Sequence, residues 1–246
     1  MLAVESLVKH FGPRIAAQNV SFTLTTGEVL GFLGPNGAGK STTMRMIAGR
    51  LEPDSGRVLI GDHDVAADRR AAQKMIGYLP EGAPAYPSMT PQSFVKFCLR
   101  ARGFSGAALK SATDSALERA RLGDAAQQRI ATLSKGYKRR AALAAAIAHD
   151  PPLLILDEPT DGLDPNQKDQ VRGLIRDMAS DKAIIVSTHI LEEVPAVCTR
   201  TIVIHRGCIL ADESPDELAA RTRTGRLDDA FRHLTISDDQ QEGAAA

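Results

Sequence analysis

The sequence predicts an α/β fold, and three observations lead to this prediction. Short apolar segments of strand character alternate with longer segments of helical periodicity along most of the chain. A glycine-rich stretch, "GPNGAGKST", lies between one such strand and one such helix. Between about residues 90 and 150 the alternation gives way to sequence rich in Ala, Leu, Arg and Gln, which predicts a helical insert. With 246 residues, the chain is long enough for one large domain or two small ones.

The first third of the chain predicts a strand, a helix and a small β region. The apolar stretch "VLGFLG", residues 29–34, predicts a buried strand that runs into the glycine-rich stretch. After that stretch, Met44, Ile47, Ala48 and Leu51 are spaced at i, i+3, i+4 and i+7, which predicts a helix with one buried stripe. The segment "RVLIGDHDV" alternates with a period of two and contains a Gly-Asp turn, so we expect it to belong to a small β region.

Beyond the insert, the alternation of strands and helices resumes. The insert itself ends in "AALAAAIA", residues 141–148, which is nearly pure helix former. "PPLLILDEP" then predicts a buried strand, and Val171, Leu174, Ile175 and Met178 predict one face of the next helix. "KAIIVSTH" and "RTIVIHRGCIL" predict two further strands.

The C-terminal region predicts two helix starts and a tail. In "SPDEL", Ser214 is a candidate cap, Pro215 suits the first helical position, and Glu217 can bond back to the cap. Leu227, Phe231 and Leu234 predict one more short helix. We expect the last ten residues, "SDDQQEGAAA", to be disordered.

Composition excludes several classes of protein. Thirty basic residues balance thirty acidic residues, so net charge gives no indication of nucleic-acid binding. The apolar runs fall far short of the roughly 18 residues that a membrane helix needs. The N-terminus does not resemble a signal peptide. The three cysteines form no close pair and no metal spacing, which favours reduced thiols in a cytoplasmic protein.

The stretch "GPNGAGKST" matches the phosphate-binding pattern G-x-x-x-x-G-K-[ST]. Glycines at 34, 37 and 39 allow backbone N–H groups to curl around a β-phosphate. Lys40 supplies a positive charge to the β- and γ-phosphates, and the Ser41 hydroxyl suits Mg²⁺. A chance match is expected in roughly one chain in a hundred of this length. The predicted nucleotide-binding residues of the loop are Gly34, Pro35, Asn36, Gly37, Ala38, Gly39, Lys40, Ser41 and Thr42.

A second motif, "LLILDEPT", supplies carboxylates. Four apolar residues predict a buried strand, and Asp157 follows at its C-terminal end, where α/β folds bind ligands. A carboxylate there can hold Mg²⁺, and Glu158 can orient and deprotonate an attacking water. The alternative is a strand that ends in solvated acidic residues without a catalytic role. The phosphate-binding loop upstream makes this alternative the weaker interpretation. Together the two motifs predict a P-loop NTPase with bound Mg²⁺, but they do not choose among the branches of that class.

Three further stretches resemble the ATP-binding cassette family. "LSKGY" looks like the signature loop of that family, "DGLD" like its D-loop with Asp164, and His189 like its switch histidine. Phe11 stands where the family places an aromatic residue on the adenine. The order and spacing match from about residue 2 to residue 218. The resemblance implies a P-loop core of ABC type with a small antiparallel β subdomain and a helical subdomain, and catalytic roles for Lys40, Glu158 and His189.

The resemblance also divides the chain. It implies a nucleotide-binding domain at residues 1–220, with a helical subdomain at about 88–150 inserted into the core, and a C-terminal segment, 221–246, with a short helix and a disordered tail.

The signature-like loop has physical properties of its own. Ser134 and Gly136 precede an Ala-rich helix, so a hydroxyl, backbone N–H groups and a helix dipole are expected to form an anion site. An ordinary helix cap is the alternative. A second anion site makes sense where it closes over the γ-phosphate held by another copy. The resemblance implies such an arrangement, with two cassettes stacked head to tail around two ATP molecules and with Ser134, Lys135 and Gly136 facing the partner's nucleotide.

The sequence departs from the family pattern at three positions. Lys135 replaces a glycine and Tyr137 a glutamine, and Lys135 either adds charge near the γ-phosphate of the other copy or points to solvent. Glu81 stands where the family has a glutamine. Its carboxylate still offers an oxygen to Mg²⁺, so we favour a neutral variant over altered coupling.

The stretches "YLPE", "LSKGYKRR" and "ILDEPTDGLDPNQ" together look most like the cassettes of ABC-2 type permeases. Within that branch they look most like the gliding-motility type ATPases, and "GRLDDAFRHLT" is similar to the closing helix of that branch. The resemblance implies an ATPase subunit on the inner face of the cell membrane, bound to a separate polytopic permease and dimerising with itself or a related cassette. The expected docking region is near Tyr86–Phe104, including Pro91, Phe94 and Phe97, although Phe94 and Phe97 singly suit packing within the insert. We expect no nucleic-acid partner.

Other functions fit the sequence less well. A non-transport cassette acting on a soluble or nucleic-acid partner remains the alternative, but the chain has one phosphate loop and no coiled-coil heptads. A P-loop kinase or GTPase is disfavoured, because the GTPase base-reading motif N-K-x-D is absent and the stretch "LSKGY" would have no role in either. An inactive binding module is disfavoured, because Lys40, Asp157, Glu158 and His189 are all present.

Overall fold

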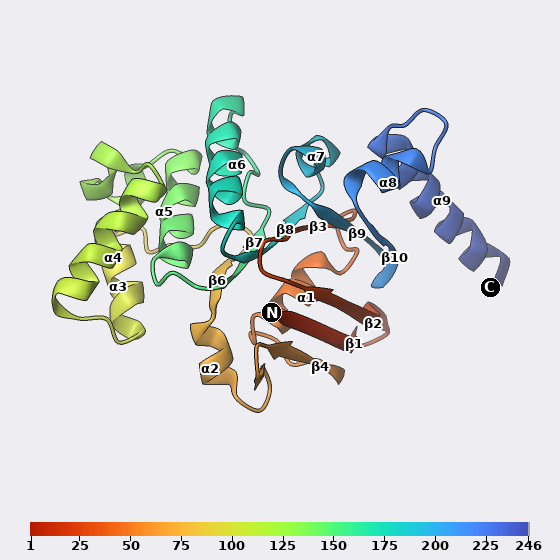
Figure 1. The fold of residues 1–246 in the computed structure, drawn as a ribbon, viewed down its shortest axis with the longest axis horizontal. Helices are drawn as coiled ribbons and strands as arrows, with labels where there is room; N and C mark the ends of the chain where they lie inside the picture. The colour runs from red at the N-terminus through yellow and green to blue at the C-terminus, as the bar shows by residue number, and fades with distance from the viewer. Residues whose placement is uncertain (246) are drawn as a thin grey trace.

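A mainly parallel sheet lies at the centre of the molecule (Figure 1). The computed structural model describes the backbone of residues 1–245 and the side chains of residues 1–236. The central sheet has the order β10-β9-β3-β8-β7-β6, in which β10 pairs antiparallel with β9 and the other neighbours pair parallel. Its strands are β3 (Val29–Leu33), β6 (Ile76–Leu79), β7 (Leu153–Asp157), β8 (Ala183–Thr188), β9 (Arg200–His205) and β10 (Cys208–Glu213).

The three middle strands are buried on both faces. Every residue of β3, β7 and β8 is buried, as expected of parallel strands that helices or a second layer cover on each side. Side chains alternate along β7, so Leu153 and Ile155 join one core cluster whereas Leu154 and Leu156 join another. The apolar runs that predicted these strands therefore contribute side chains to two separate cores, one on each face of the sheet.

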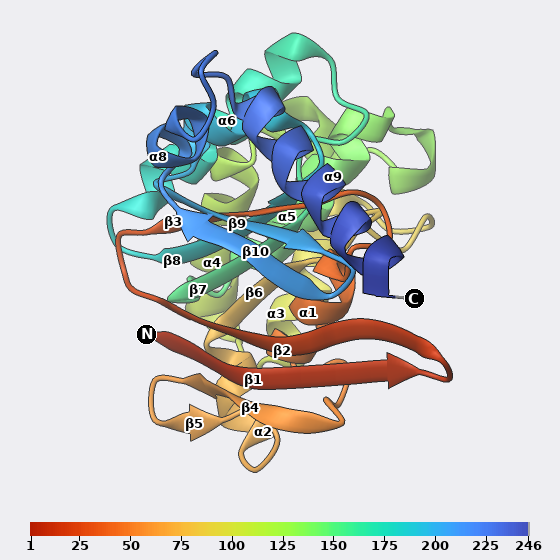
Figure 2. The ribbon, with the colours of Figure 1, turned by 90° about the vertical axis from the view of Figure 1, so that its right-hand side faces the viewer.

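One face of the central sheet packs against helix α1 and a smaller antiparallel sheet. The smaller sheet has the order β2-β1-β4-β5 and lies below the central sheet in Figure 2. Phe22 of the smaller sheet packs against Phe32 of β3, with ring centroids 5.7 Å apart. The elements on this side are β1 (Leu2–Phe11), β2 (Arg14–Leu24), β4 (Ser55–Ile60), β5 (His63–Asp64), α1 (Lys40–Ile47) and α2 (Arg69–Lys74).

Helix α1 buries the predicted stripe but ends before it is complete. Met44, Ile47 and Ala48 are buried, whereas the helix ends at Ile47 and Leu51 lies beyond it, half-buried against the same core. Gly49 follows with a φ of 62°, a left-handed conformation that commonly terminates helices. The end of α1 is therefore set by this glycine rather than by the periodicity.

A helical subdomain stands at one side of the molecule in Figure 1 and has a core of its own. Val95, Leu99 and Leu117 are buried in it, together with alanines of the Ala-rich helix. Its elements lie between Pro91 and Ile147, and they confirm the helical subdomain of the predicted fold class. They are α3 (Pro91–Ala101), α4 (Gly106–Arg119), η1 (Gly123–Gln127), η2 (Ile130–Thr132) and α5 (Lys135–Ile147).

The remaining helices follow the last strands of the central sheet. The 15-residue helix α6 covers the sheet with Val171, Ile175 and Met178, which are buried as predicted. The elements are α6 (Pro165–Ala179), η3 (Leu191–Glu193), α7 (Val194–Val197), α8 (Pro215–Ala220) and α9 (Leu227–Ala245). Within residues 1–245, no helix has both the length and the hydropathy needed to cross a membrane.

The C-terminal helices confirm one prediction and correct another. Ser214 and Glu217 form the predicted capping box at the start of α8. Helix α9 extends over 19 residues to Ala245, so the expectation of a short helix followed by a disordered tail is wrong up to that residue. Extending an existing helix costs much less than starting one, and "SDDQQEGAA" contains no proline to stop it. Ala246 lies outside the described residues.

Candidate nucleotide site

The phosphate-binding pattern forms a loop between β3 and α1. The loop borders a cavity of about 180 Å³, and Glu158 and Glu81 also line this cavity. Of the predicted loop residues, Asn36, Gly37, Gly39, Lys40, Ser41 and Thr42 line the cavity. Gly34, Pro35 and Ala38 lie in the same loop without lining it. The sequence pattern therefore produces a polar hollow at the N-terminus of a helix, where anions bind favourably.

Two glycines of the loop are required by its close packing. Gly39 has a φ of 107°, and a Cβ there would lie 2.2 Å from the carbonyl oxygen of Ala16 in β2. A Cβ on Gly34 would lie 2.3 Å from the carbonyl oxygen of Ile204 in β9. Any other residue would push the loop away from the strands behind it. These two positions therefore fix the shape of the cavity.

Lys40 is buried with its ammonium held near the cavity. It is 6% exposed and donates to the carbonyl oxygens of Gly34 at 2.7 Å and Pro35 at 3.2 Å. Burial lowers the pKa of Lys40, against the attraction of the carboxylates of Glu158 and Asp157. The nearer carboxylate oxygen, Oε1 of Glu158, is 4.0 Å from Nζ. A buried ammonium with only long-range carboxylate partners favours an anion in the cavity.

Asp157 has the environment expected of a metal ligand. Its side chain is completely buried at the end of β7, with Oδ1 accepting hydrogen bonds from Ser187 and, at 3.4 Å, from Ser41. Its other oxygen, Oδ2, is buried without a hydrogen-bond partner among the described residues. An unsatisfied carboxylate oxygen beside the Ser41 hydroxyl fits a hard cation such as Mg²⁺. Ser41 and Glu81 both line the nucleotide cavity.

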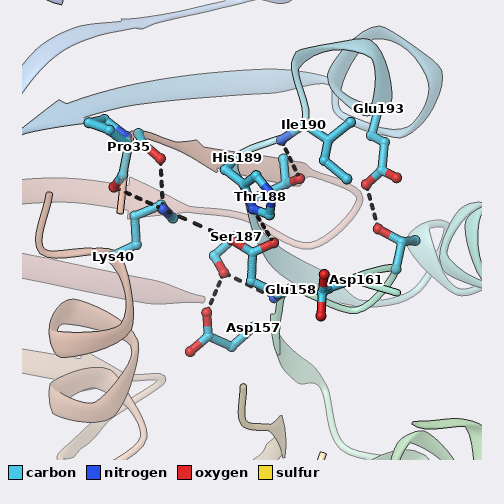
Figure 3. Close-up of polar contacts among 12 residues, drawn as sticks. Pro35, Lys40, Asp157, Glu158, Asp161, Ser187, Thr188, His189, Ile190 and Glu193 are labelled. Atoms are coloured by element: carbon cyan, nitrogen blue, oxygen red, sulfur yellow. Dashed lines mark hydrogen bonds and ion pairs between the residues drawn. The ribbon is translucent and has the colours of Figure 1, made fainter. Parts of the chain in front are cut away.

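Glu158 and His189 lie together beside Lys40, as Figure 3 shows. Nδ1 of His189 is 2.8 Å from Oε2 of Glu158. Glu158 is 8% exposed and lines the cavity, whereas the His189 side chain is 45% exposed. This arrangement orients a carboxylate toward the phosphate-binding loop, with an imidazole next to it. It can position a water for attack on a phosphoryl group.

The signature-like loop caps helix α5. The Ser134 side chain accepts a hydrogen bond from the N–H of Tyr137 at 3.4 Å. A Cβ on Gly136 would lie 2.0 Å from Oε1 of Gln167, at the start of α6. Asp164 caps α6 in the same way, accepting from the N–H of Gln167 at 3.0 Å. The segments around Ser134 and Asp164 are therefore packed against each other within one chain.

Lys135 has an ion-pair partner that the sequence did not reveal. Its ammonium lies 3.1 Å from Oδ2 of Asp161, although 65% of the side chain is exposed. Arg139, which is buried, donates to the carbonyl oxygen of Asp161 at 2.6 Å. Lys135 and Arg139 hold the pKa of the Asp161 carboxyl below its ordinary value, Lys135 contributing more through its hydrogen bond. The departure from glycine therefore places a cation on the chain's own "DGLD" segment.

Two groups of predicted residues stand apart from the cavity. Phe11 is 51% exposed at the end of β1, with the Lys9 ammonium 5.8 Å from its ring centroid, and it does not line the cavity. The signature residues Ser134, Lys135 and Gly136 do not line it either. A second cavity, of about 590 Å³, has Glu81 on its wall together with Lys135, Lys138, Arg139 and Asp161. Glu81 therefore borders both spaces.

Sequence reasoning missed three residues at the site. Arg14 lines the cavity and donates to the carbonyl oxygen of Gly37 at 3.1 Å. Ser187 bonds both to Asp157 and to the N–H of Glu158. Arg139 is the buried partner of Asp161. Only Ser187 had a signal, because it stands at the end of the predicted strand that leads to His189.

The chain is similar in sequence to proteins of known families. Residues 17–161 match the family model described as ABC transporter. A Nod factor export ATP-binding protein I from Bradyrhizobium diazoefficiens is 39% identical over 211 residues, 85% of this chain and 69% of the relative. The linearmycin resistance ATP-binding protein LnrL from Bacillus subtilis is 34% identical over 238 residues, 96% of this chain and 75% of the relative.

Solved structures show the same fold. The structure of an ATP-binding subunit of an ABC transporter superposes with a TM-score of 0.86 at 29% identity, covering 95% of this chain and 99% of the other. An ATP-binding cassette solved as a dimer in a post-hydrolysis state, bound to ADP and Pi, superposes with a TM-score of 0.79 at 25% identity. That match covers 87% of this chain and 98% of the other. These likenesses agree with the P-loop core and its two subdomains.

Proposed function

Because the chain belongs to the ABC transporter family, as an ATP-binding and ATP-hydrolysing subunit, we propose that it dimerises around ATP and drives a separate ABC-2 type membrane permease. The observation that carries the proposal is the grouping of Lys40, Glu158 and His189 at the phosphate-binding loop. This grouping supplies a phosphate contact, a general base and a group that orients it.

The geometry supports a dimeric site. Ser134 stands at the N-terminus of α5 but does not line the cavity around Lys40. The phosphate-binding loop and the N-terminus of α5 can each bind one side of a nucleotide's phosphates, but within one chain they do not border the same cavity. In a head-to-tail dimer, each signature loop would cover the nucleotide held by the other chain. The partner is a second copy or a related cassette.

Ser41, Asp157 and Glu81 are the residues we assign to Mg²⁺. The cation would neutralise charge on the phosphates and leave the phosphorus open to water. Glu158 is the general base, held by His189, and Lys40 contacts the phosphates. The nucleotide contacts come from the loop residues 34–42, with Phe11 stacking on the adenine. The assignment of Asp157 is supported by its unpaired buried oxygen.

A groove beside the helical subdomain suits a permease. A cavity of about 810 Å³ lies between α3, α5 and the segment after β6. Tyr86 stands over it with its ring centroid 5.5 Å from Phe97 and 6.0 Å from Phe94, both in edge-on contact. Phe94 is 8% exposed and also packs within the subdomain, whereas Tyr86 and Phe97 are 52% and 45% exposed. Exposed aromatic residues beside a groove are typical of binding sites for protein partners.

Docking of the permease would place the chain at the inner face of the cell membrane. The relatives' names concern Nod factor export and linearmycin resistance, which favours export over import for this chain as well. The transported substrate belongs to the permease.

The test is capture of partners from detergent-solubilised membranes. Tagged Glu158→Gln chain is used with ATP, and the same chain with ADP is the control. We expect a polytopic membrane protein in near-stoichiometric amount with ATP. If soluble protein, ribosomes or nucleic acid are captured instead, the chain is a non-transport ATPase of the same family.

A further inference from the structure

A basic cavity lies beside the groove that we assign to the permease. Its volume is about 400 Å³, and its walls come from the end of α1, from α2, β6 and the end of α3. In Figure 1, α2 lies below β6 and α3 lies to its left. The charged residues that line it are Arg50, Arg70, Lys74 and Arg102, and no carboxylate is among the lining residues.

These four cations lack carboxylate partners. Among residues 1–236, no ion pair involves any of them, and the Arg102 guanidinium instead donates to the carbonyl oxygens of Gln73 at 3.1 Å and Ile76 at 3.2 Å. Pairing is common nearby, since Arg69 lies 2.5 Å from Glu52 and Arg57 lies 2.6 Å from Glu5. Like charges in one cavity repel, and the positive charge of Arg50 helps to lower the pKa of Arg102, after the larger effect of burial.

The basic cavity is continuous with the aromatic groove. The two share Arg50, Tyr78, Ala101 and Arg102 as lining residues. The Arg50 guanidinium lies 6.0 Å from the Tyr78 ring centroid, at the junction. One surface therefore offers an apolar, aromatic end and a cationic end to the same ligand.

We propose that this surface binds a cytosolic segment of the permease that carries an apolar anchor and, next to it, acidic side chains. The apolar anchor would lie against Tyr86 and Phe97, and the acidic side chains would neutralise Arg50, Lys74 and their neighbours. A free phosphate would satisfy only the cationic end, so the shared lining favours an elongated peptide. The inference rests on the proposed function and adds the chemistry of the partner.

The test reverses the charge of the cavity in the capture experiment. Arg50→Glu combined with Lys74→Glu, in the Glu158→Gln chain with ATP, is expected to lower the captured permease by about tenfold, because like charges across an interface repel. Both side chains are exposed, and neither lines the nucleotide cavity. With Glu158 intact, the double variant should therefore hydrolyse ATP at the parent rate. Lys110→Glu on α4, also exposed and outside both cavities, is the matched control and should capture normally.

A charge swap completes the test. Lysines placed at acidic positions in the cytosolic segments of the captured permease should restore capture by the double variant. If the double variant captures as much permease as the parent, the inference is overturned while the proposed function stands. The same holds if no swap restores capture. If the parent captures no membrane protein at all, the proposed function fails and this inference fails with it.

Discussion

Glu158 is positioned by its backbone as well as by its side chain. Its φ of 53° lies in the left-handed region, which costs a non-glycine residue about 1–2 kcal/mol. Its N–H donates to both the carbonyl oxygen and Oγ of Ser187, each at 3.1 Å, and its carboxylate meets Nδ1 of His189. These bonds hold the strained turn, which directs the carboxylate toward Lys40 rather than into solvent.

Glu81→Gln should retain ATP hydrolysis within about threefold of the parent rate. Glu81 lines the nucleotide cavity, but it is one of three carboxylates that attract Lys40 and the weakest of them. A glutamine keeps an oxygen for Mg²⁺ while removing one negative charge. Steady-state phosphate release, measured over a range of Mg²⁺ concentrations, checks this expectation. Near-complete loss of turnover would mean that the charge of Glu81 is itself required.

The Lys40→Ala variant tests whether the loop holds the phosphates. It should weaken ATP binding by about a hundredfold, because truncating one member of a buried charge pair costs about 3 kcal/mol. Fluorescence titration with a labelled nucleotide measures the affinity. Unchanged affinity would show that the loop does not hold the phosphates.

The residues predicted from sequence are those whose chemistry depends on local pattern. Lys40, Ser41 and Asp157 follow from two short motifs. Lys40 and Ser41 line the nucleotide cavity, and the Ser41 hydroxyl lies 3.4 Å from Oδ1 of Asp157. The Lys135–Asp161 ion pair and the Arg14–Gly37 bond join segments 26 and 23 residues apart. No short pattern encodes such contacts, because they depend on how the elements pack.

At the scale of elements, a buried carboxylate joins the segment after β8 to helix α6. Glu193 is 5% exposed, and its Oε1 lies 3.2 Å from Nζ of Lys168 and 3.3 Å from the guanidinium of Arg172. Its Oε2 accepts a hydrogen bond from Thr160, two residues beyond Glu158. Figure 3 shows Glu193 on the turn that follows His189. This network therefore ties together the segments that carry Glu158 and His189.

Glu193→Ala should lower the free energy of unfolding by about 2 kcal/mol, since it leaves two cations without their buried partner. The loss is below the value for fully buried pairs, because Lys168 and Arg172 are 24% and 21% exposed. For a chain of this size, the midpoint of thermal unfolding should fall by about 4–8 °C. Calorimetry of Glu192→Ala, whose side chain is exposed, is the control and should show almost no change. Equal midpoints for the two variants would contradict the structural role of Glu193.

Elements with strong periodicity were predictable, and those that depend on neighbours were not. The strands at "VLGFLG" and "LLILDEPT" and the stripe of α6 are as the sequence indicated. The length predicted for the last helix was too short, because α9 extends to Ala245. A polar composition does not distinguish a disordered tail from the continuation of a helix that has already formed.

At the scale of the whole molecule, the chain holds the two halves of its expected site apart. The loop around Lys40 borders the nucleotide cavity, whereas Ser134 caps α5 outside that cavity. A monomer can therefore bind ATP but presents no helix N-terminus to the exposed side of the γ-phosphate. In the proposed dimer, a second chain turned head to tail would supply one. Dimerisation should then depend on ATP and on Ser134.

Glu158→Gln should bind ATP, hydrolyse it about a thousandfold more slowly because the general base is lost, and accumulate as a dimer. Light scattering after size-exclusion chromatography, with ATP and with ADP, measures the mass. Adding Ser134→Ala should abolish the dimer but leave nucleotide binding intact, because in the proposed dimer Ser134 would contact the nucleotide of the other chain. A thermal scan of the double variant checks that losing the cap, worth about 1 kcal/mol, has not unfolded α5. A Glu158→Gln chain that stays monomeric at saturating ATP would contradict the head-to-tail dimer, and the second half of the site would then have to come from the permease.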